Sequence, residues 1–567
     1  MVSGIRILII GGLATGPKAA ARARRLNPDA EITIIEQGDF VSYSSCGIPY
    51  YIGGQIPNFE DLVNTPVGIT RNPAYFDAVK GIKVLLNTKA VKIDREQKKV
   101  YTVRVDSGEE TALPYDKLVI ATGSRPRRLP FEGMKLKNVS TVWTLDDARK
   151  IREQLINGNV KKVVIIGAGL IGLETAEAIR QARNIPNKPP EVTVLEALPH
   201  IAPAILDPEI SDLVRKRLKE HHISIHTNTI VRELEGDENG KVRQVITDQG
   251  NYPADLVLVT VGATPNVALA EDAGLKIGIT GAIAVNEYLQ TSDPDIYAGG
   301  DCVENINLIT GKPAYYQNGA VANRHGRVIG TNLAGGKDIF PGVLGTTVFK
   351  IFDHTVGRTG LTERQAREEG FEVITSIVGG SDHAHFYPDA RPLVIKLIAD
   401  RATRRLLGAQ LVGTGNVDKR LDTIAVALST AATVDQIANF DLAYAPPYNA
   451  AMDVLHHAAN TLRNKLDGWA RSIGPQEASS MLQKQDDIIL VDVRTSREFE
   501  KNPPPFNNVA FIPLGKLRAM SDQLPKDKEL LIYCQVSQRA WEAQRILQEK
   551  GFEKVRFIEG GLLAWPY

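Results

Sequence analysis

The sequence is poor in cysteine, balanced in charge and without any long apolar run. Its 567 residues include only three cysteines, Cys46, Cys302 and Cys534, which are far apart and form no C-x-x-C pair. This excludes a disulfide framework and a cysteine-rich zinc site, and we predict no metal site. The net charge of +1 gives no general attraction to nucleic acid or an anionic membrane, and no apolar run is long enough to span one. We therefore expect a cytoplasmic protein that binds neither.

The hydrophobic pattern changes along the chain and predicts several domains. Strands rich in Val and Ile alternate with helices up to about residue 330, as in parallel α/β sheets. Residues 336–450 instead predict an α+β module with a mixed sheet. The α/β pattern returns after a polar segment that contains Gly468, Gly474 and Pro475, and this segment is typical of a linker.

A complete dinucleotide-binding pattern occurs near residue 170. Gly167, Gly169 and Gly172 form G-x-G-x-x-G between the strand KVVII and a helix, and the next strand ends at Glu196. The glycines permit a tight turn and close approach of a pyrophosphate, and the acid accepts from a ribose 2′-hydroxyl. Because Glu196 would repel a 2′-phosphate, the pattern favours NADH over NADPH.

A second, less regular glycine turn lies at the N-terminus. Gly11 and Gly16 are the first and last glycines of the pattern, Leu13 replaces the middle one, and the following strand ends at Glu36. Either this turn binds a second dinucleotide, or it is a strand-to-helix turn without a ligand.

Three further segments resemble the connecting motifs of the two-dinucleotide flavoprotein disulfide reductases. They are ATGSRPR (121–127), VGATPN (261–266) and IYAGGDC (296–302). The resemblance implies FAD at the first turn and NAD(P)H at the second, with Thr122, Gly123 and Asp301 at the FAD site. Cys302 in the last motif is interpreted as a small buried residue.

Cys46 lies in S-Y-S-S-C-G-I-P-Y (42–50), where this family has its redox cysteine. A single cysteine here implies a sulfenic acid or a mixed disulfide with a small thiol. With LAYAPPY (442–448), the segment resembles the coenzyme A-disulfide reductases. That resemblance implies that Tyr444 reaches the cysteine of the other subunit and that Tyr387 lies near the same pocket. Both tyrosines could equally be half-buried aromatics.

Basic residues of the first predicted helix suit the phosphates of coenzyme A. Lys18, Arg22 and Arg25 lie on one helix face, which is either a phosphate site or a solvated surface. The resemblance adds other CoA-binding positions, which are Ser42, Ser45, Arg71 and Asn323.

The last predicted domain contains Cys534 at the end of the strand ELLIYC, before a short loop and a helix. Backbone amides of such a loop stabilise a thiolate or a persulfide anion. With VDVR and the closing FIEGGLLAW, residues 475–567 resemble a rhodanese domain, although Ser537 replaces the common loop glycine.

Together these features predict an α/β protein with two Rossmann-like domains, an α+β dimerisation domain and a C-terminal α/β rhodanese domain. The expected activity is NADH-driven, FAD-dependent reduction of persulfides, polysulfide or CoA disulfides by a homodimer, with Cys46 as the reacting thiol and Cys534 delivering sulfane sulfur. An NADH oxidase or peroxidase that uses a Cys46 sulfenic acid, and a non-catalytic sulfur carrier or redox sensor, are the alternatives. The predicted boundaries are 1–150 with 270–335 for FAD, 151–269 for NAD(H), 336–455 for dimerisation, 456–474 for the linker and 475–567 for rhodanese.

Overall fold

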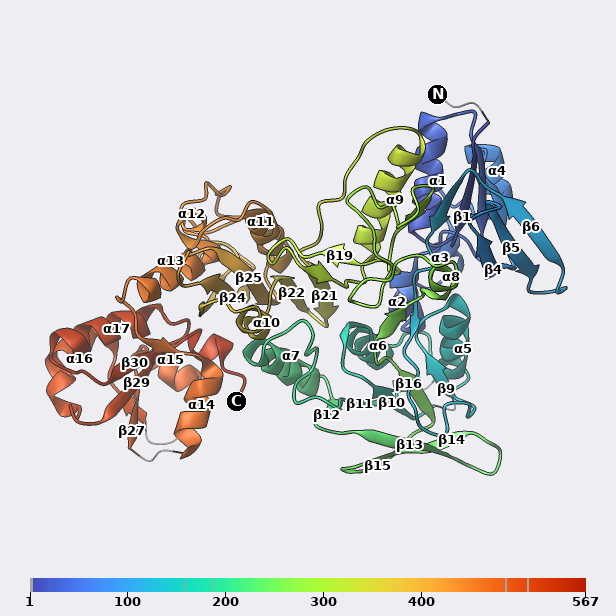
Figure 1. Cartoon of the computed structure of the whole chain (residues 1–567). Helices are drawn as coiled ribbons and strands as arrows, with labels where there is room; N and C mark the ends of the chain where they lie inside the picture. The colour runs from blue at the N-terminus through green and yellow to red at the C-terminus, as the bar shows by residue number, and fades with distance from the viewer. Residues whose placement is uncertain (1–3, 159, 187, 485–486, 507–508) are drawn as a thin grey trace. The chain divides into compact units, whose positions relative to one another are not determined.

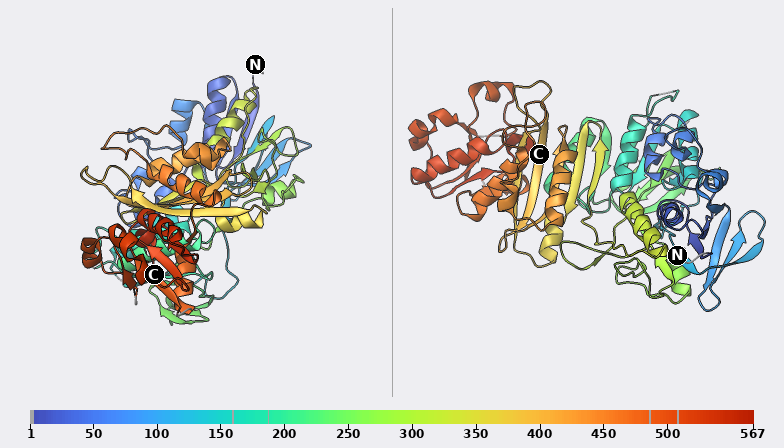
Figure 2. Two further views of the ribbon diagram at one scale, coloured as in Figure 1. Left: turned by 90° about the vertical axis from the view of Figure 1, so that its left-hand side faces the viewer. Right: turned by 90° about the horizontal axis from the view of Figure 1, so that it is seen from above.

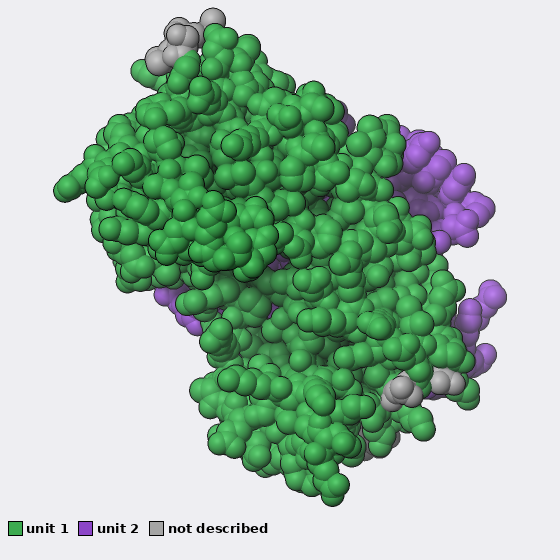
Figure 3. All heavy atoms as spheres, turned by 90° about the vertical axis from the view of Figure 1, so that its right-hand side faces the viewer, with its two compact units in different colours: residues 1–195, 229–343 green, residues 196–228, 344–567 purple. Residues whose placement is uncertain are grey.

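The computed structural model describes residues 4–158, 160–186, 188–484, 487–506 and 509–567 (Figure 1). The chain divides into two compact units, which Figure 3 distinguishes by colour. Unit 1 contains residues 1–195 and 229–343, and unit 2 contains residues 196–228 and 344–567.

The first sheet of unit 1 has five parallel strands in the order β18-β7-β1-β2-β3. Its central strand β1 is a continuous apolar run, as expected for a strand that is covered on both faces. Helices α1 and α9 lie side by side and pack on this sheet (Figure 2). The bounds are β1 Arg6–Ile10, β2 Glu31–Ile35, β3 Lys83–Leu85, β7 Lys117–Ile120, β18 Ile296–Ala298, α1 Thr15–Leu26 and α9 Gly319–Leu333.

A second parallel sheet repeats this design around the second glycine turn. Within unit 1 its strands follow the order β11-β10-β16-β9, and helix α6 begins directly after the turn. The bounds are β9 Val139–Thr141, α5 Leu145–Ile156, β10 Lys162–Ile166, α6 Leu170–Arg180, β11 Glu191–Leu195 and β16 Leu256–Val259.

Smaller elements complete unit 1. Besides the two main sheets, unit 1 contains two three-stranded antiparallel sheets and two short antiparallel strand pairs. They comprise β4 Thr88–Asp94, β5 Lys99–Arg104, β6 Glu110–Pro114, β8 Ser124–Pro126, β13 Val231–Gly236, β14 Val242–Thr247, β15 Gly250–Pro253, β17 Ala263–Pro265, β19 Asn305–Ile306 and β20 Pro313–Ala314. The short helices are α2 Ile48–Ile52, α3 Glu60–Val63, α4 Pro73–Lys80 and α8 Ala268–Asp272.

The central module of unit 2 is built on one sheet in the order β21-β22-β25-β24-β23, and every strand pair in it is antiparallel. The prediction of a mixed sheet was therefore wrong. Turns or a single short helix connect successive strands, and connections of that length favour antiparallel neighbours. The bounds are β21 Thr347–Ile351, β22 His354–Gly360, α10 Glu363–Glu368, β23 Val373–Ser381, β24 Pro392–Asp400, β25 Leu406–Gly413, α11 Val417–Ser429, α12 Val434–Ile437 and α13 Val454–Leu466.

The segment 456–474, for which the sequence predicts a linker, is largely regular structure. Helix α13 continues to Leu466 and packs on β23, and β26 (Ser472–Ile473) pairs with a strand of the C-terminal module. Apolar residues of α13 recur at helical spacing and are buried, so this helix is part of a core.

The C-terminal module is a parallel sheet in the order β26-β30-β29-β27-β28, flanked by helices. The three strands that the sequence predicts here, IILVD, ELLIY and VRFI, are all present. The bounds are α14 Pro475–Lys484, β27 Ile488–Asp492, α15 Ser496–Lys501, β28 Val509–Phe511, α16 Leu514–Met520, β29 Glu529–Tyr533, α17 Gln538–Glu549 and β30 Val555–Ile558.

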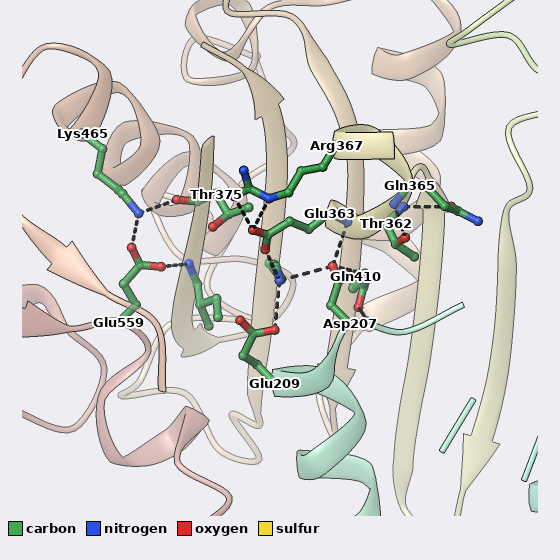
Figure 4. Close-up of polar contacts among 12 residues, drawn as sticks. Asp207, Glu209, Thr362, Glu363, Gln365, Arg367, Thr375, Gln410, Lys465 and Glu559 are labelled. Atoms are coloured by element: carbon green, nitrogen blue, oxygen red, sulfur yellow. Dashed lines mark hydrogen bonds and ion pairs between the residues drawn. The ribbon is translucent and has the colours of Figure 1, made fainter. Parts of the chain in front are cut away.

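Unit 2 also contains α7 (Pro208–Glu220) and β12 (Ile223–His226), which the sequence predicts within the NAD(H)-binding domain. Lys396 on β24 is fully buried, and its Nζ lies 3.2 Å from Asp207, 2.9 Å from Glu209 and 2.8 Å from Glu363 (Figure 4). Burial lowers the pKa of Lys396, but the three carboxylates outweigh this effect and hold the pKa above its usual value. This ion cluster binds the start of α7 to the central sheet.

A buried carboxylate joins the C-terminal module to the central module. Glu559 accepts hydrogen bonds from the Ile377 amide of β23 at 2.8 Å and from the Ser472 hydroxyl at 2.6 Å. It also pairs with Lys465 of α13 (Figure 4). The C-terminal module is thus attached through specific polar contacts as well as through the connecting chain.

Candidate active site

The first glycine turn positions the acid at the end of β2. Both carboxylate oxygens of Glu36 accept backbone hydrogen bonds, one from Gly12 and one from Gly38, each at 2.8 Å. Gly11 has a φ of +112°, and a Cβ there would lie 2.1 Å from the Ala121 carbonyl oxygen. Only glycine fits at this position, and the turn therefore has the geometry of a dinucleotide site.

The motifs that carry the family resemblance pack together in unit 1. Strand β8 of the first motif pairs with β17 of the second, and the Thr122 hydroxyl donates to the Asn266 carbonyl at 2.6 Å. Gly123 adopts a φ of +64° in the same turn. Asp301 accepts from the Asn318 amide at 3.3 Å, at the N-terminus of α9. Burial raises the pKa of Asp301.

Cys46 is exposed on a three-residue turn that leads into α2. A Cβ placed on Gly319, the first residue of α9, would lie 3.9 Å from its Sγ. The thiol therefore lies at the N-terminal end of a fifteen-residue helix. Cys46, Asp301 and the first glycine turn belong to the same unit.

A half-buried acid–phenol pair adjoins this turn, and sequence reasoning missed it. The hydroxyl of Tyr50 on α2 donates to Glu174 on α6 at 3.3 Å. Burial raises the pKa of Glu174 to about 7, and burial together with Glu174 raises the pKa of Tyr50 to about 12. Glu174 follows the second glycine turn directly, but its burial depends on packing between α2 and α6 that no local pattern encodes.

The second glycine turn has the geometry of a nucleotide site. Gly167 has a φ of +101°, and a Cβ on Gly172 would lie 2.1 Å from the Gly167 carbonyl oxygen. A Cβ on Gly169 would meet nothing within 4 Å, so the outer side of this turn is open to a pyrophosphate at the start of α6. Glu196 follows β11 directly and accepts from the Leu198 amide at 2.9 Å.

The basic face of α1 runs along α9. Cβ atoms on Gly326 and Gly330 would lie 2.7 Å from Lys18 Cβ and 2.6 Å from Arg22 Cβ, so the two helices approach closely there. The Arg22 Nε donates to the Thr331 hydroxyl at 3.1 Å.

The other predicted CoA positions fall into two groups. Asn323 lies on α9 and donates to the Gly319 carbonyl at 2.8 Å, and Arg25 is exposed on the last turn of α1. Arg71 donates to the Ser42 carbonyl at 3.0 Å, while Ser45 begins the Cys46 turn. Ser42 in turn donates its amide to the Gly12 carbonyl at 2.7 Å, which places the Ser42–Arg71 pair beside the first glycine turn.

The two predicted tyrosines lie on loops of the central module in unit 2. Tyr387 lies between β23 and β24, and Tyr444 lies between α12 and α13. Their exposed fractions are 41% and 54%. Neither ring is therefore part of the core of the chain.

Cys534 differs from Cys46 because it is completely buried. It follows β29 directly, and its carbonyl accepts from the Leu562 amide at 3.0 Å. Ser537 begins α17 with a φ of +86°, and its hydroxyl is buried without a hydrogen-bond partner among the described residues. The serine thus adopts the left-handed conformation that glycine normally occupies.

An ion pair that the sequence analysis did not identify borders the Cys534 loop. Arg539 donates to both carboxylate oxygens of Glu498 at 2.6 Å. The hydrogen bond to Glu498 is the main cause that raises the pKa of Arg539, and the nearby Cys534 adds to this effect. This pairing lowers the pKa of Glu498 to about 2. The closing Arg539 of the loop therefore has a carboxylate partner.

Cys302 is a buried core residue, as the sequence predicts, and burial raises the pKa of its thiol. Among the residues that the structure describes, no group of three or more His, Cys, Asp or Glu side chains is arranged to hold a metal ion. In the same residues no helix has the length and apolar character needed to cross a membrane.

Two Rossmann-type turns, each with an acid after the following strand, and a lone cysteine at a helix N-terminus define a flavin- and pyridine-nucleotide-dependent oxidoreductase. The chain belongs to the pyridine nucleotide-disulphide oxidoreductase family, whose model matches residues 5–321. Residues 346–455 match the dimerisation domain of that family, and residues 474–566 match a rhodanese-like domain. These matches confirm the predicted fold class, and FAD and a pyridine nucleotide are the cofactors of this family.

Several known proteins are similar to most or all of this chain. The chain is 37% identical over 459 residues to the NAD(P)H coenzyme A polysulfide/persulfide reductase of Pyrococcus horikoshii. The aligned region covers 81% of this chain and 98% of that relative. The solved structure of a NAD-dependent persulfide reductase from A. fulgidus gives a TM-score of 0.93 at 44% identity, over 99% of this chain and 100% of that one. The crystal structure of reduced Bacillus anthracis CoADR-RHD gives a TM-score of 0.89 at 32% identity, and the match covers 99% of this chain and 98% of that one.

Proposed function

We propose that this protein uses NADH and FAD to reduce persulfides, polysulfide or CoA disulfides at Cys46. The observation that carries the proposal is the exposed Cys46 thiol at the N-terminus of α9, in the same unit as the first glycine turn. The relatives named above as persulfide and polysulfide reductases support this substrate class.

The proposed chemistry needs one thiolate and one electron pair. Cys46 attacks the outer sulfur of a persulfide RSSH, which forms a Cys46 persulfide and releases RSH. The two glycine turns would hold FAD and NADH, and these cofactors would supply the two electrons needed to break the new S–S bond and release hydrosulfide. The net change is RSSH + NADH + H⁺ → RSH + H₂S + NAD⁺. A CoA disulfide reacts in the same way and yields two thiols.

The nucleotide sites are assigned from the two turns. Gly11, Gly16, Glu36 and the Thr122–Gly123 segment would hold FAD with Asp301. Gly167, Gly169 and Gly172 would hold NADH, and Glu196 would accept from its ribose. The carboxylate of Glu196 supports NADH rather than NADPH as the preferred donor.

The CoA moiety would bind beside Cys46. Lys18, Arg22 and Arg25 present cations along α1 for its phosphates, and Arg71 adds another beside Ser42. Ser45 and Asn323 lie at the start of the Cys46 turn and on α9. These positions follow from the family resemblance, and the name of the Pyrococcus relative supports them.

The rhodanese-like domain would accept sulfane sulfur on Cys534 and deliver it for reduction at Cys46. The loop amides and the start of α17 support a persulfide anion on this cysteine.

The active form would be a homodimer with composite active sites. The family's dimerisation domain supports this assembly, and so do large exposed side chains on this domain, namely Phe386, Tyr387, Tyr444, Tyr448 and Met452. Tyr444 would then donate a hydrogen bond to the thiolate that departs from the partner's Cys46, with Tyr387 near the same pocket.

Anaerobic NADH consumption with CoA persulfide tests the proposal. We expect one hydrosulfide released per NADH, and little NADH consumption with oxygen alone. Rapid NADH oxidation by oxygen without a sulfur substrate would instead identify an NADH oxidase. If NADH fails to bleach the flavin, the protein is a sulfur carrier or redox sensor.

A further inference from the structure

The two exposed tyrosines of the central module lie on separate loops. The Tyr387 loop (residues 382–391) connects β23 to β24, and the Tyr444 loop (residues 438–453) connects α12 to α13. Two side chains on different loops can serve one reaction only when something fixes the loops relative to each other.

A single buried guanidinium contacts both loops. Arg420 on α11 is 1% exposed, and its Nη2 donates to the Asp382 carbonyl at 2.5 Å, at the start of the Tyr387 loop. The same nitrogen donates to Asn449 Oδ1 at 3.2 Å and to Asp453 Oδ2 at 2.9 Å, at the end of the Tyr444 loop. Asp453 provides the opposite charge that a buried arginine requires.

Asn449 extends this contact to the neighbour of Tyr444. Its side chain is 1% exposed, and its Nδ2 donates to the Ala443 carbonyl at 3.2 Å while its Oδ1 accepts from Arg420. The amide therefore closes the Tyr444 loop on itself and connects it to the guanidinium. A buried amide with both ends bonded leaves this loop little freedom.

Asp382 performs the same task for the Tyr387 loop. Its carboxylate accepts from the Arg391 amide at 2.9 Å, which closes the neck of the loop, and from the Asn416 amide at 3.2 Å. The next residue, His383, bonds the Pro388 carbonyl at 3.1 Å and packs edge-on against the Tyr387 ring at 5.8 Å. A chain of contacts thus runs from Arg420 to Tyr387.

We propose that Arg420, acting through Asn449 and Asp382, is a positioning residue that sets the two tyrosines at the distance and orientation the reaction needs. The inference rests on the proposed function of Tyr444. It adds that the sulfur-reducing half-reaction depends on a buried cluster with no substrate contact of its own, whereas flavin reduction by NADH does not depend on it.

Asn449→Ala tests the proposal with the least disturbance, because it leaves the Arg420–Asp453 pair intact. We expect kcat for CoA disulfide or CoA persulfide to fall by about tenfold or more, since small misplacements of reacting groups cost up to ~100-fold. The rate of flavin reduction by NADH and the kcat/KM for NADH should not change. In Tyr444→Phe, the added Asn449→Ala should have almost no further effect on kcat.

Asn439→Ala is the matched control. Asn439 lies near the start of the same loop and also donates from Nδ2 to a backbone carbonyl, that of Asp435 at 2.8 Å, but it is exposed and does not contact Arg420. We expect unchanged kcat. Arg420→Lys keeps a cation opposite Asp453 but loses the guanidinium hydrogen bonds to Asp382 and Asn449. This variant should show the same kinetics as Asn449→Ala and retain its FAD.

The outcomes separate the two proposals. If Tyr444→Phe is as active as the unchanged protein, the proposed role of the tyrosine is wrong. If Tyr444→Phe is impaired but Asn449→Ala is not, or if Asn449→Ala slows flavin reduction equally, the positioning role of Arg420 is overturned and the proposed function stands.

Discussion

Cys46 and Cys534 lie in contrasting environments, which differ in solvent exposure and in their charged neighbours. Both cysteines precede a helix, but Cys46 is exposed on a short turn while Cys534 is fully buried at the end of a strand. Near Cys46 the ionisable neighbour is the Tyr50–Glu174 pair, whereas Arg539 and Glu498 border the Cys534 loop. An exposed thiol beside a cofactor turn suits repeated attack on substrates, and a buried one suits storage of a protected sulfur atom.

The largest effect should come from Cys46→Ser. The hydroxyl is a poor nucleophile at neutral pH, so sulfur reduction should fall by roughly a thousandfold or more. FAD content and bleaching of the flavin by NADH should be retained. Turnover within tenfold of the unchanged protein would remove Cys46 from the mechanism.

Cys534→Ser should have a smaller and selective effect. Reduction of CoA disulfide needs only Cys46 and should continue. Activity towards persulfides or polysulfide supplied through the rhodanese site should fall by about tenfold or more, because the cysteine that would deliver their sulfane sulfur to Cys46 at a raised local concentration is lost. Parallel rates of hydrosulfide release with the two substrates provide the measurement. Equal loss with both substrates, or no loss with either, would contradict a separate role for Cys534.

Glu174→Gln tests how the acid near Cys46 makes the stability of the protein depend on pH. The pKa of this half-buried carboxyl is about 7, above its value in the unfolded chain, so the folded state loses stability as pH rises from about 4.5 to 7. The glutamine variant should lack this loss, which amounts to about 3 kcal/mol at pH 8. Denaturant unfolding at pH 5 and pH 8 measures it. The same pH dependence in both proteins would show that Glu174 ionises normally.

Glu498→Gln should have the smallest effect and a different pH window. Pairing with Arg539 lowers the pKa of Glu498 to about 2, so its contribution is present above the unfolded pKa and is lost as pH falls from about 4.5 to 2. Both side chains are partly exposed, which limits the contribution to less than about 1 kcal/mol. Thermal unfolding at pH 3 and pH 6 should differ less in the variant. An equal or larger difference between the two pH values in the variant would contradict the assignment.

The sequence predicts the parts of the molecule whose chemistry is local. The glycine turns at Gly11 and Gly167 require backbone conformations that other residues avoid, so the spacing of their glycines is enough to identify them. Cys46 and Cys534 are equally visible because so few cysteines occur. The strands of the parallel sheets are recognisable from continuous apolar runs.

Long-range packing is what the sequence does not reveal. Three features depend on contacts between residues that are far apart in the sequence. They are the burial of Cys534, the hydrogen bond between Tyr50 and Glu174, and the contacts of Arg420. The polar residues of α13 resemble a linker because its buried face becomes evident only once β23 is in place. The antiparallel order of the central sheet likewise follows from its connections and not from strand composition.

The hydrogen bond from the Ile377 amide to Glu559 affects how the chain could be shortened. Ile377 lies on β23, the edge strand of the central sheet, and a carboxylate from the C-terminal module occupies its outward amide. A chain shortened to end at Leu466 would expose this edge and leave Lys465 without Glu559. Unprotected edge strands recruit other chains and aggregate. The rhodanese-like domain therefore protects an edge of the central module, and a version without the last domain would need a charged or proline residue on β23 to limit aggregation.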